Sequence, residues 1–201
     1  MDKAPLRIPP LPREQWTEAA REVFGFFEGE TAREQGSRSN SIMVLANHPS
    51  LALASLAFGK YLLLESTLSQ RQKELVVLRL AWRYQSEYQW VQHVFTGRRI
   101  GMVDPEFDAL QLDEIPGSAF PPEEHDLLSA IDQLCRSGRI DDPTWAALNA
   151  SMNRHQLMDF LYAVGFFTMN AWAFGAMGVQ VEAEYQPFSV LDDLAGRGGP
   201  G

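Results

Sequence analysis

Apolar residues recur at intervals of three and four along most of the chain, and this spacing predicts helices. An early example is the stretch 14–28, in which Trp16, Ala20, Val23 and Phe24 would line one side of a helix. No stretch shows the alternation of apolar and polar residues, bounded by turn residues, that is typical of strands. The pattern therefore predicts an all-α protein.

Serines, prolines and glycines mark where the predicted helices begin and end. Ser69 and Ser86 are each followed three positions later by a glutamine, which is the capping-box pattern of a helix start. Gly101 is typical of the residue that follows a helix end. About seven helices are expected, and the candidate stretches are 14–28, 50–64, the stretch from Ser69, 86–101, 123–136, 142–151 and 153–179, with a short helix over 104–110. A loop is expected over 33–39, a short apolar turn over 41–46, and a Pro/Gly-rich connection over 115–122.

The length of 201 residues fits one domain with a substantial core. Residues 1–12 are rich in proline and predict an extended arm. Residues 13–190 would form the helical domain. The glycine-rich end, 191–201, predicts a disordered tail.

The stretch 160–179 is almost entirely apolar, with Thr168 and Asn170 as its clearly polar residues. Its length approaches the roughly 20 residues that span a bilayer, but no cluster of lysine or arginine flanks it. We therefore expect a helix that is buried all round, in the core or in a subunit interface. This favours a homo-oligomer, a dimer or an assembly built on trimers, and no membrane partner.

Charge and cysteine content narrow the function classes. The formal net charge is −9 and the pI is about 4.9, which disfavours nucleic acid and anionic membranes as partners. Cys135 is the one cysteine, so no disulfide or redox pair can form within the chain. The first residues lack the apolar core of a signal peptide. A cytoplasmic protein with a small-molecule substrate is expected.

Four polar residues in the stretch 68–101 are spaced so that they would meet. Ser86, Gln89 and His93 are three and four positions apart and share one face of a helix. Glu74 lies on the preceding predicted helix, twelve residues before Ser86. If the two helices pack side by side, Glu74 approaches the second helix.

This frame resembles that of the carboxymuconolactone decarboxylase/AhpD-like family. Redox members carry a Glu, then a Cys-x-x-Cys twelve residues later, then a His four residues after the second Cys. Here Glu74 and His93 stand at that spacing, and Ser86 and Gln89 occupy the cysteine positions. The stretches 46–49, 68–71 and 165–170 are similar to the family as well, so the resemblance spans roughly 9–187. It implies an all-α, AhpD-like fold.

The replaced cysteines change the chemistry that the resemblance implies. In redox members a helix N-terminus lowers the thiol pKa and creates an attacking thiolate. A serine hydroxyl is not acidic enough to replace it. The non-redox branch is therefore the better analogy. It implies a cofactor-independent lyase or isomerase acting on a small carboxylate- or lactone-like substrate.

The residues in this frame suit proton transfer next to a carbonyl. His93 is the expected acid or base, and Glu74 would orient it or itself act as the base. Tyr88 would donate a hydrogen bond to a developing oxyanion. Arg71 or Arg79 would bind a substrate carboxylate. The remaining predicted substrate-binding residues are Ser86, Gln89 and Trp90.

Two other functions stay open: a residual alkylhydroperoxidase-like redox protein and a non-catalytic binding protein of the same fold. Purely structural roles are also open for single residues. Ser86 and Gln89 would form a capping box, Tyr88 and Trp90 would pack in the core or an interface, and Glu74 would pair with Arg71, Lys73 or Arg79. Cys135 is expected to be a small core residue, and His48, before Pro49, a residue that stabilises a turn.

No metal or cofactor is expected. The four histidines are scattered, without an HxxxH or HExxH pattern. The glycine patterns of nucleotide-binding loops and the GxSxG pattern of α/β-hydrolases do not occur.

Overall fold

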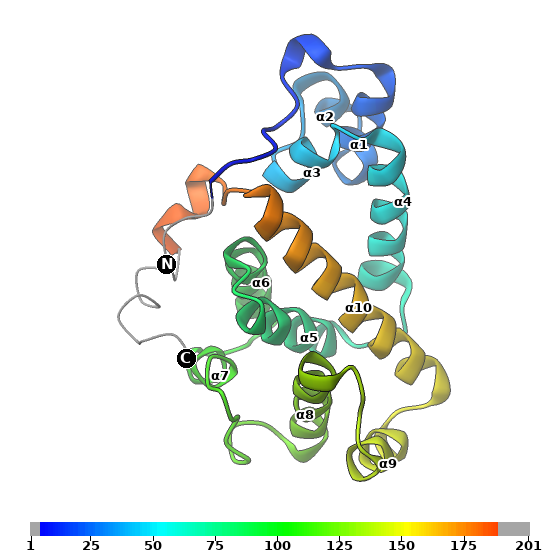
Figure 1. Cartoon of the computed structure of the whole chain (residues 1–201), viewed down its shortest axis with the longest axis vertical. Helices are drawn as coiled ribbons and strands as arrows, with labels where there is room; N and C mark the ends of the chain where they lie inside the picture. The colour runs from blue at the N-terminus through cyan, green and yellow to red at the C-terminus, as the bar shows by residue number, and fades with distance from the viewer. Residues whose placement is uncertain (1–4, 189–201) are drawn as a thin grey trace. The chain divides into compact units, whose positions relative to one another are not determined.

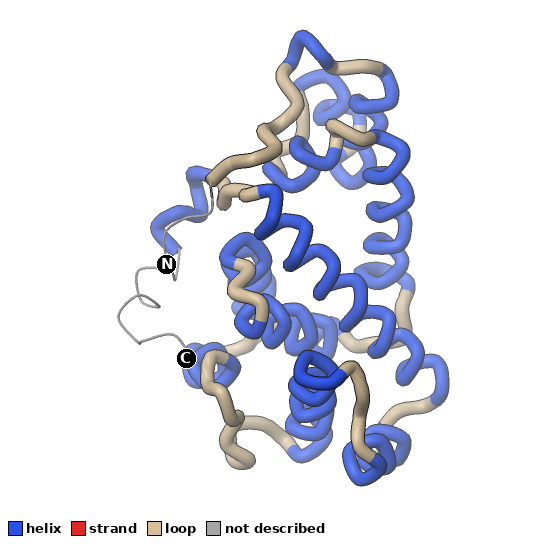
Figure 2. The backbone as a smooth tube through the Cα atoms, viewed as in Figure 1, coloured by secondary structure: helices blue, strands red, loops and turns tan. Residues whose placement is uncertain are grey.

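The computed structural model describes residues 5–188, and side chains to residue 185. Within these residues the chain forms helices and loops and no strand, so the predicted all-α class is confirmed (Figures 1 and 2). The helices are α1 (Glu18–Glu28), α2 (Glu30–Gln35), α3 (Asn40–Leu45), α4 (Pro49–Lys60), α5 (Gln70–Arg83), α6 (Glu87–Arg99), α7 (Asp104–Leu110), α8 (Pro122–Ser137), α9 (Asp142–Ser151) and α10 (Arg154–Met177). Short helical turns lie at Arg13–Gln15, Tyr61–Glu65 and Ala183–Phe188. The predicted tail, 191–201, lies outside the described residues.

The described residues contain two short helices, α2 and α3, in addition to the helices that the sequence predicted. The stretch 33–39, expected to be a loop, begins inside α2, and the expected turn over 41–46 is α3. Each has six residues, which is too short for apolar periodicity to register and too short to be stable alone. Their stability comes from packing, since α2 and α3 both contact α1. By contrast, the predicted bounds of α7 and α9 match the structure.

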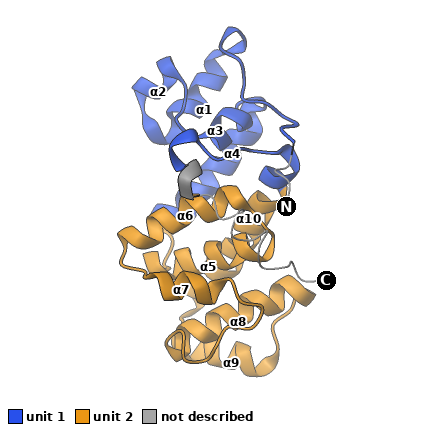
Figure 3. Ribbon diagram, turned by 90° about the vertical axis from the view of Figure 1, so that its left-hand side faces the viewer, with its two compact units in different colours: residues 1–64, 173–201 blue, residues 65–172 orange. Residues whose placement is uncertain are grey.

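The chain divides into two compact units, with one boundary after Leu64 and the other inside α10 (Figure 3). Unit 1 comprises residues 1–64 and 173–201, and unit 2 comprises residues 65–172. The stretch that carries the predicted chemistry, 68–101, lies entirely in unit 2.

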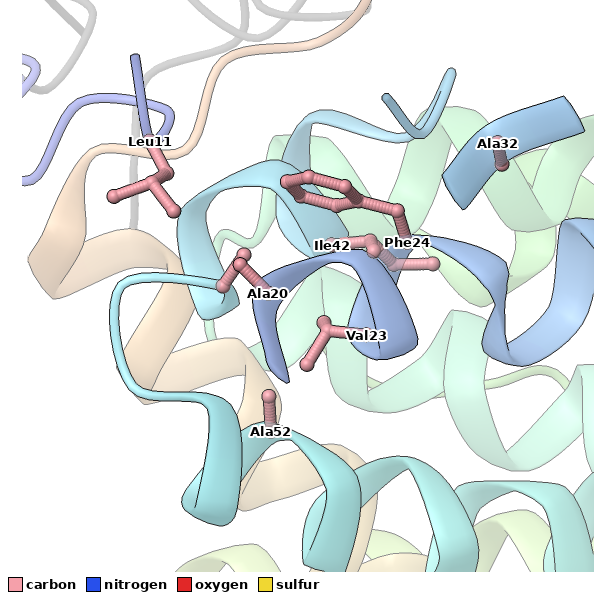
Figure 4. Close-up of a cluster of buried hydrophobic side chains, with 8 residues drawn as sticks. Leu11, Ala20, Val23, Phe24, Ala32, Ile42 and Ala52 are labelled. Atoms are coloured by element: carbon pink, nitrogen blue, oxygen red, sulfur yellow. The ribbon is translucent and has the colours of Figure 1, made fainter. Parts of the chain in front are cut away.

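Unit 1 is organised around α1, whose inner face is fully buried. Ala20, Val23 and Phe24 of α1 pack in one apolar cluster with Ile42 of α3 and Ala52 of α4 (Figure 4). The predicted N-terminal arm contributes to this cluster through Leu11, whose backbone N–H donates to the Met43 carbonyl. His48, which was expected to stabilise a turn, caps α4 by accepting a hydrogen bond from the backbone N–H of Leu51.

Unit 2 is organised around α5, which is buried on almost every side. Leu75 to Leu80 are all inaccessible to solvent because α6, α7 and α8 pack against α5. Helices α5 and α6 lie side by side, which the predicted chemistry required (Figure 1). A helix enclosed in this way can hold charged side chains out of water only if each has a partner.

Helix α10 is not buried all round, and this prediction was wrong for the single chain. Phe160, Phe167 and Ala171 are buried, but Tyr162 and Trp172 are more than half exposed. An apolar composition shows that a helix has no strongly polar face, yet the structure decides which faces are covered. By length and hydropathy α10 is the one helix among the described residues that qualifies as a membrane span, a test that core helices of soluble proteins also pass.

Candidate functional site

A tight turn between α5 and α6 sets the position of the candidate site. The backbone N–H of Gln85 donates to the Trp82 carbonyl, and that of Ser86 donates to the Ala81 carbonyl. This is the hydrogen-bond pattern of a Schellman motif, and Gln85 takes the left-handed conformation with φ 53°. Glycine is the usual residue there, so a glutamine is strained. The turn brings the start of α6 back against α5.

Glu74 and His93 meet across the two helices. A Glu74 carboxylate oxygen, Oε2, lies 2.8 Å from His93 Nδ1. Its other oxygen accepts a hydrogen bond from Gln70 Nε2 at 3.0 Å, and Glu74 is only 1% exposed. The sequence left open whether Glu74 pairs with Arg71, Lys73 or Arg79. Its hydrogen-bond partners in the structure are Gln70 and His93.

The pairing defines which His93 atom is available for chemistry. A carboxylate accepts hydrogen bonds, so Nδ1 carries the proton and Nε2 has the lone pair. Nε2 makes no hydrogen bond within residues 5–185, and a fifth of the His93 side chain is exposed. The ring of Phe167 lies against the imidazole edge-on, with centroids 5.8 Å apart. This arrangement permits His93 to take up a proton at Nε2 while Glu74 stabilises the imidazolium.

Ser86 and Gln89 do not form the predicted capping box, and that prediction was wrong. The Ser86 side chain accepts no hydrogen bond from α6, and Gln89 Nε2 instead donates to the Phe167 carbonyl at 3.1 Å. Both residues are 4% exposed. Ser86 Oγ and Gln89 Oε1 have no hydrogen-bond partner, which distinguishes them from the other buried side-chain oxygens and nitrogens of the described residues. The box at Ser69 and Gln72 is confirmed.

Tyr88 and Trp90 are buried, as the structural alternative for them predicted. Trp90 packs against Trp82 of α5, with ring centroids 5.8 Å apart. Tyr88 is two residues after Ser86, which in a helix places it about 200° round the axis from Ser86. It therefore does not share the face of α6 that carries Ser86 and His93.

Arg79 is fully buried and saturated with hydrogen bonds. Its Nε and Nη2 bind both oxygens of Asp132 at 2.8 and 2.6 Å. Nη1 donates to the carbonyls of Leu110 and Leu112, and Nη2 also donates to that of Asp113. These five bonds use all five N–H donors of a guanidinium. The arginine therefore has no donor left for a substrate carboxylate.

Arg71 is half-buried and bonded to two carboxylates. Its Nε lies 2.6 Å from Glu124 Oε1, its Nη2 lies 2.9 Å from Oε2, and Nη2 also binds Glu106. These hydrogen bonds raise the pKa of Arg71 above its ordinary value. Both arginines that were expected to hold a substrate carboxylate thus bind carboxylates of the chain itself.

Gln70 and Phe167, which contact the pair, were not singled out from the sequence, and Lys73 was named there as a possible partner of Glu74 only. Gln70 is four residues before Glu74, and this helical spacing is a signal that points to it. Lys73 is 7% exposed, and burial lowers its pKa against the opposing effects of Glu74 and Asp159. Phe167 comes from α10, and no local pattern connects it with His93.

Cys135 lies in α8 and is half-buried. Burial raises the pKa of its thiol, although a hydrogen bond with Tyr84 acts in the opposite direction. The same environment raises the pKa of Tyr84 to about 12. A thiol in this state is a poor nucleophile. Among the described residues, no three His, Cys, Asp or Glu side chains are grouped as metal ligands.

Solved structures share this fold. The AhpD-core, peroxidase-related protein of Ralstonia eutropha has a TM-score of 0.74 and 18% identity, over 90% of this chain and 95% of that one. A peroxidase-related protein of Silicibacter sp. has a TM-score of 0.73 and 19% identity, over 92% of this chain and 97% of that one. A cysteine-to-alanine variant of the debrominase Bmp8, in complex with 2,3,4-tribromopyrrole, has a TM-score of 0.73 and 15% identity, over 96% of this chain and 100% of that one.

These likenesses show that the chain has the AhpD-like fold, which the sequence predicted. No protein-family profile matches the chain, and no curated protein matches it. The function is therefore argued from the site itself.

Proposed function

We propose that this chain is a cofactor-independent enzyme that transfers a proton next to a carbonyl group, a lyase or isomerase of the carboxymuconolactone decarboxylase type. The substrate is a small carboxylate- or lactone-like molecule. The observation that carries the proposal is the 2.8 Å contact between Glu74 Oε2 and His93 Nδ1, with Nε2 left for a substrate. The debrominase with the same fold acts on a small molecule, which supports an enzyme here as well.

In the proposed step, His93 Nε2 removes a proton from the carbon beside the carbonyl, and the electron pair of the C–H bond moves into an enolate. The imidazolium is held by Glu74, which acts as a positioning residue. The proton then returns to another carbon in an isomerisation or to the leaving group in an elimination. In a decarboxylation, carbon dioxide leaves and the carbon takes a proton from Nε2. Acid–base catalysis of this kind typically contributes about 10²–10⁴-fold.

The experiment follows hydrogen–deuterium exchange beside the carbonyl in a panel of small ketones, lactones and keto acids, by proton NMR in D₂O. Wild type is expected to catalyse exchange for part of the panel, and His93→Ala to lose it by about 10²–10⁴-fold. His155→Ala is the matched control, because His155 is an exposed histidine of unit 2. Equal exchange by wild type and His93→Ala would overturn the proposal.

Glu74 is tested by Glu74→Gln, which keeps the shape and removes the charge. Because the carboxylate orients the imidazole and stabilises the imidazolium that forms during the step, its loss is expected to lower the exchange rate per folded molecule. A residue with a merely structural role would lower the amount of folded protein and leave the rate per folded molecule unchanged.

The redox alternative is disfavoured by the state of Cys135, since burial raises the pKa of its thiol. We expect no thiol-dependent peroxide reduction by wild type. Reduction that is lost in Cys135→Ser would replace the acid–base proposal with the redox one. The binding-protein alternative predicts tight binding of a panel compound without any exchange.

We also propose that a second copy of the chain covers the exposed side of α10. Met158, Tyr162, Met169 and Trp172 are 47–62% exposed, and with Gly165 they are spaced four, three, four and three residues apart, as in a helix–helix seam. Together they leave on the order of 400 Å² of apolar surface, which is typical of an association surface. Sedimentation is expected to show dimers or trimers that Trp172→Glu dissociates. A monomer at micromolar concentration would contradict this.

A further inference from the structure

Two buried oxygens on α6, the helix that carries His93, have no hydrogen-bond partner among the described residues, and we argue from them to the chemistry of the ligand. Ser86 Oγ and Gln89 Oε1 are on residues that share the His93 face of α6. Leaving a buried polar atom unpaired destabilises a fold. Ser86 and Gln89 are three residues apart, so the two unpaired oxygens belong to one face of α6 and point to a group that binds there.

The orientation of the Gln89 amide decides what that group must offer. Its Nε2 donates to the Phe167 carbonyl, and the reversed orientation would place oxygen against oxygen. The unpaired atom is therefore an acceptor, and it requires an N–H or O–H donor. The Ser86 hydroxyl can donate as well as accept, so it suits a carbonyl oxygen of the same ligand.

The charges around the site disfavour an anionic ligand. Glu74 is a buried carboxylate bonded to His93, and Gln89 presents an oxygen. Arg79 and Arg71 are bound to carboxylates of the chain. Burial lowers the pKa of Lys73, while the negative charges of Glu74 and Asp159 act to raise it, so this ammonium group is already balanced by carboxylates of the chain. The partial positive charge at the start of α6 is met by Glu87 in its first turn.

We propose that the start of α6 binds a neutral carbonyl compound that carries an N–H or O–H donor, with Gln89 Oε1 accepting from the donor and Ser86 Oγ donating to the carbonyl. The inference rests on the proposed function, because it describes the substrate of the same site. Among the proposed substrates it excludes the anionic carboxylates and retains neutral carbonyl compounds that carry a hydrogen-bond donor.

The test compares three six-membered rings of similar size by ligand-observed NMR titration. 2-Piperidone has an N–H beside its carbonyl, cyclohexanone has a methylene there, and cyclohexanecarboxylate is an anion. In Gln89→Leu the preference for 2-piperidone over cyclohexanone, measured as the ratio of their dissociation constants, is expected to fall about tenfold, which is about 1.4 kcal/mol. The matched control is Gln92→Leu, on the same helix, which is expected to keep the wild-type ratio.

Several outcomes would overturn the inference. They are an unchanged ratio in Gln89→Leu, tighter binding of cyclohexanecarboxylate than of 2-piperidone to wild type, and no binding of any ring at millimolar concentration. The absence of binding would be the result if an ordered water, and not a ligand, bonds to Ser86 Oγ and Gln89 Oε1. His93→Ala separates this inference from the proposed function, because it is expected to abolish exchange and to keep the ratio. If His93→Ala keeps the wild-type ratio of dissociation constants but wild type catalyses no hydrogen–deuterium exchange, the proposed enzyme activity is contradicted. The proposed binding chemistry is then still supported.

Discussion

Helix α5 carries two buried charge clusters, and they differ in how completely their hydrogen bonds are made. Around Arg79 every guanidinium donor has an acceptor, and Asp132 also receives a bond from Arg83 Nε at 2.9 Å. Around Glu74 the carboxylate is satisfied, but His93 Nε2, Ser86 Oγ and Gln89 Oε1 have no hydrogen-bond partner within residues 5–185. A closed network stabilises the fold, whereas an open one retains capacity for another molecule. The Arg79 cluster is therefore expected to contribute mainly to stability, and the Glu74 cluster is the one on which the proposed function depends.

The largest expected effect is loss of stability when the closed cluster is broken. Arg79→Met is expected to lower the free energy of unfolding by about 3–5 kcal/mol, because it leaves buried groups unpaired. The open cluster around Glu74 should respond differently, so Gln89→Leu is expected to change the free energy of unfolding by less than about 1 kcal/mol. Urea unfolding followed by circular dichroism measures both. Similar losses in the two variants would remove the distinction.

The second-largest expected effect is a loss of stability at low pH, through Asp132 in the closed cluster. Burial acts to raise the pKa of Asp132, but hydrogen bonds from Arg79 and Arg83 outweigh it and hold the pKa below the ordinary value. The unfolded chain therefore takes up the proton first, at its ordinary pKa of about 3.9. The stability from this group is fully present above that pH and is lost as the pH falls through the lower, folded-state pKa. Unfolding midpoints measured between pH 6 and pH 3 should fall for wild type and fall less for Asp132→Asn.

The two serines that precede α5 and α6 allow the same comparison with a smaller expected effect on stability. Ser69 Oγ accepts from the backbone of Gln72, so Ser69→Ala is expected to cost about 1 kcal/mol. Ser86 makes no such bond, and Ser86→Ala is expected to leave stability unchanged or slightly higher. The two thermal midpoints, compared under one condition, test this. A lower midpoint for Ser86→Ala than for Ser69→Ala would mean that the hydroxyl of Ser86 has a structural partner.

The smallest effect concerns the strained turn that positions Ser86. At Gln85 the φ of 53° favours glycine, so Gln85→Gly relieves strain of about 1 kcal/mol. It also loses the hydrogen bond from Gln85 Nε2 to the Trp82 carbonyl and makes the unfolded chain more flexible. We expect a net change within about 0.5 kcal/mol of wild type in urea unfolding. A large loss would show that this side chain, and not the backbone pattern, holds the turn.

Much of the fold could be predicted from local patterns. The bounds of α7 and α9 and the cap at Ser69 each depend on residues within a few positions of one another. The spacing of Glu74, Ser86, Gln89 and His93 was visible for the same reason. Helices α2 and α3 were missed because their stability comes from contacts with α1 and not from their own six residues.

The sequence by itself determined that the chain is helical, that it has the AhpD-like fold, and that Glu74 and His93 stand on neighbouring helices. Only the tertiary structure decided which polar residues are satisfied. Arg79 and Asp132 are 53 residues apart, and Gln89 and Phe167 are 78 apart. Residue spacing within a helix predicts a shared face, but partners at such separations depend on how several helices pack. Ser86 therefore looked like a helix cap in the sequence, and the structure shows an unpaired hydroxyl beside the candidate site.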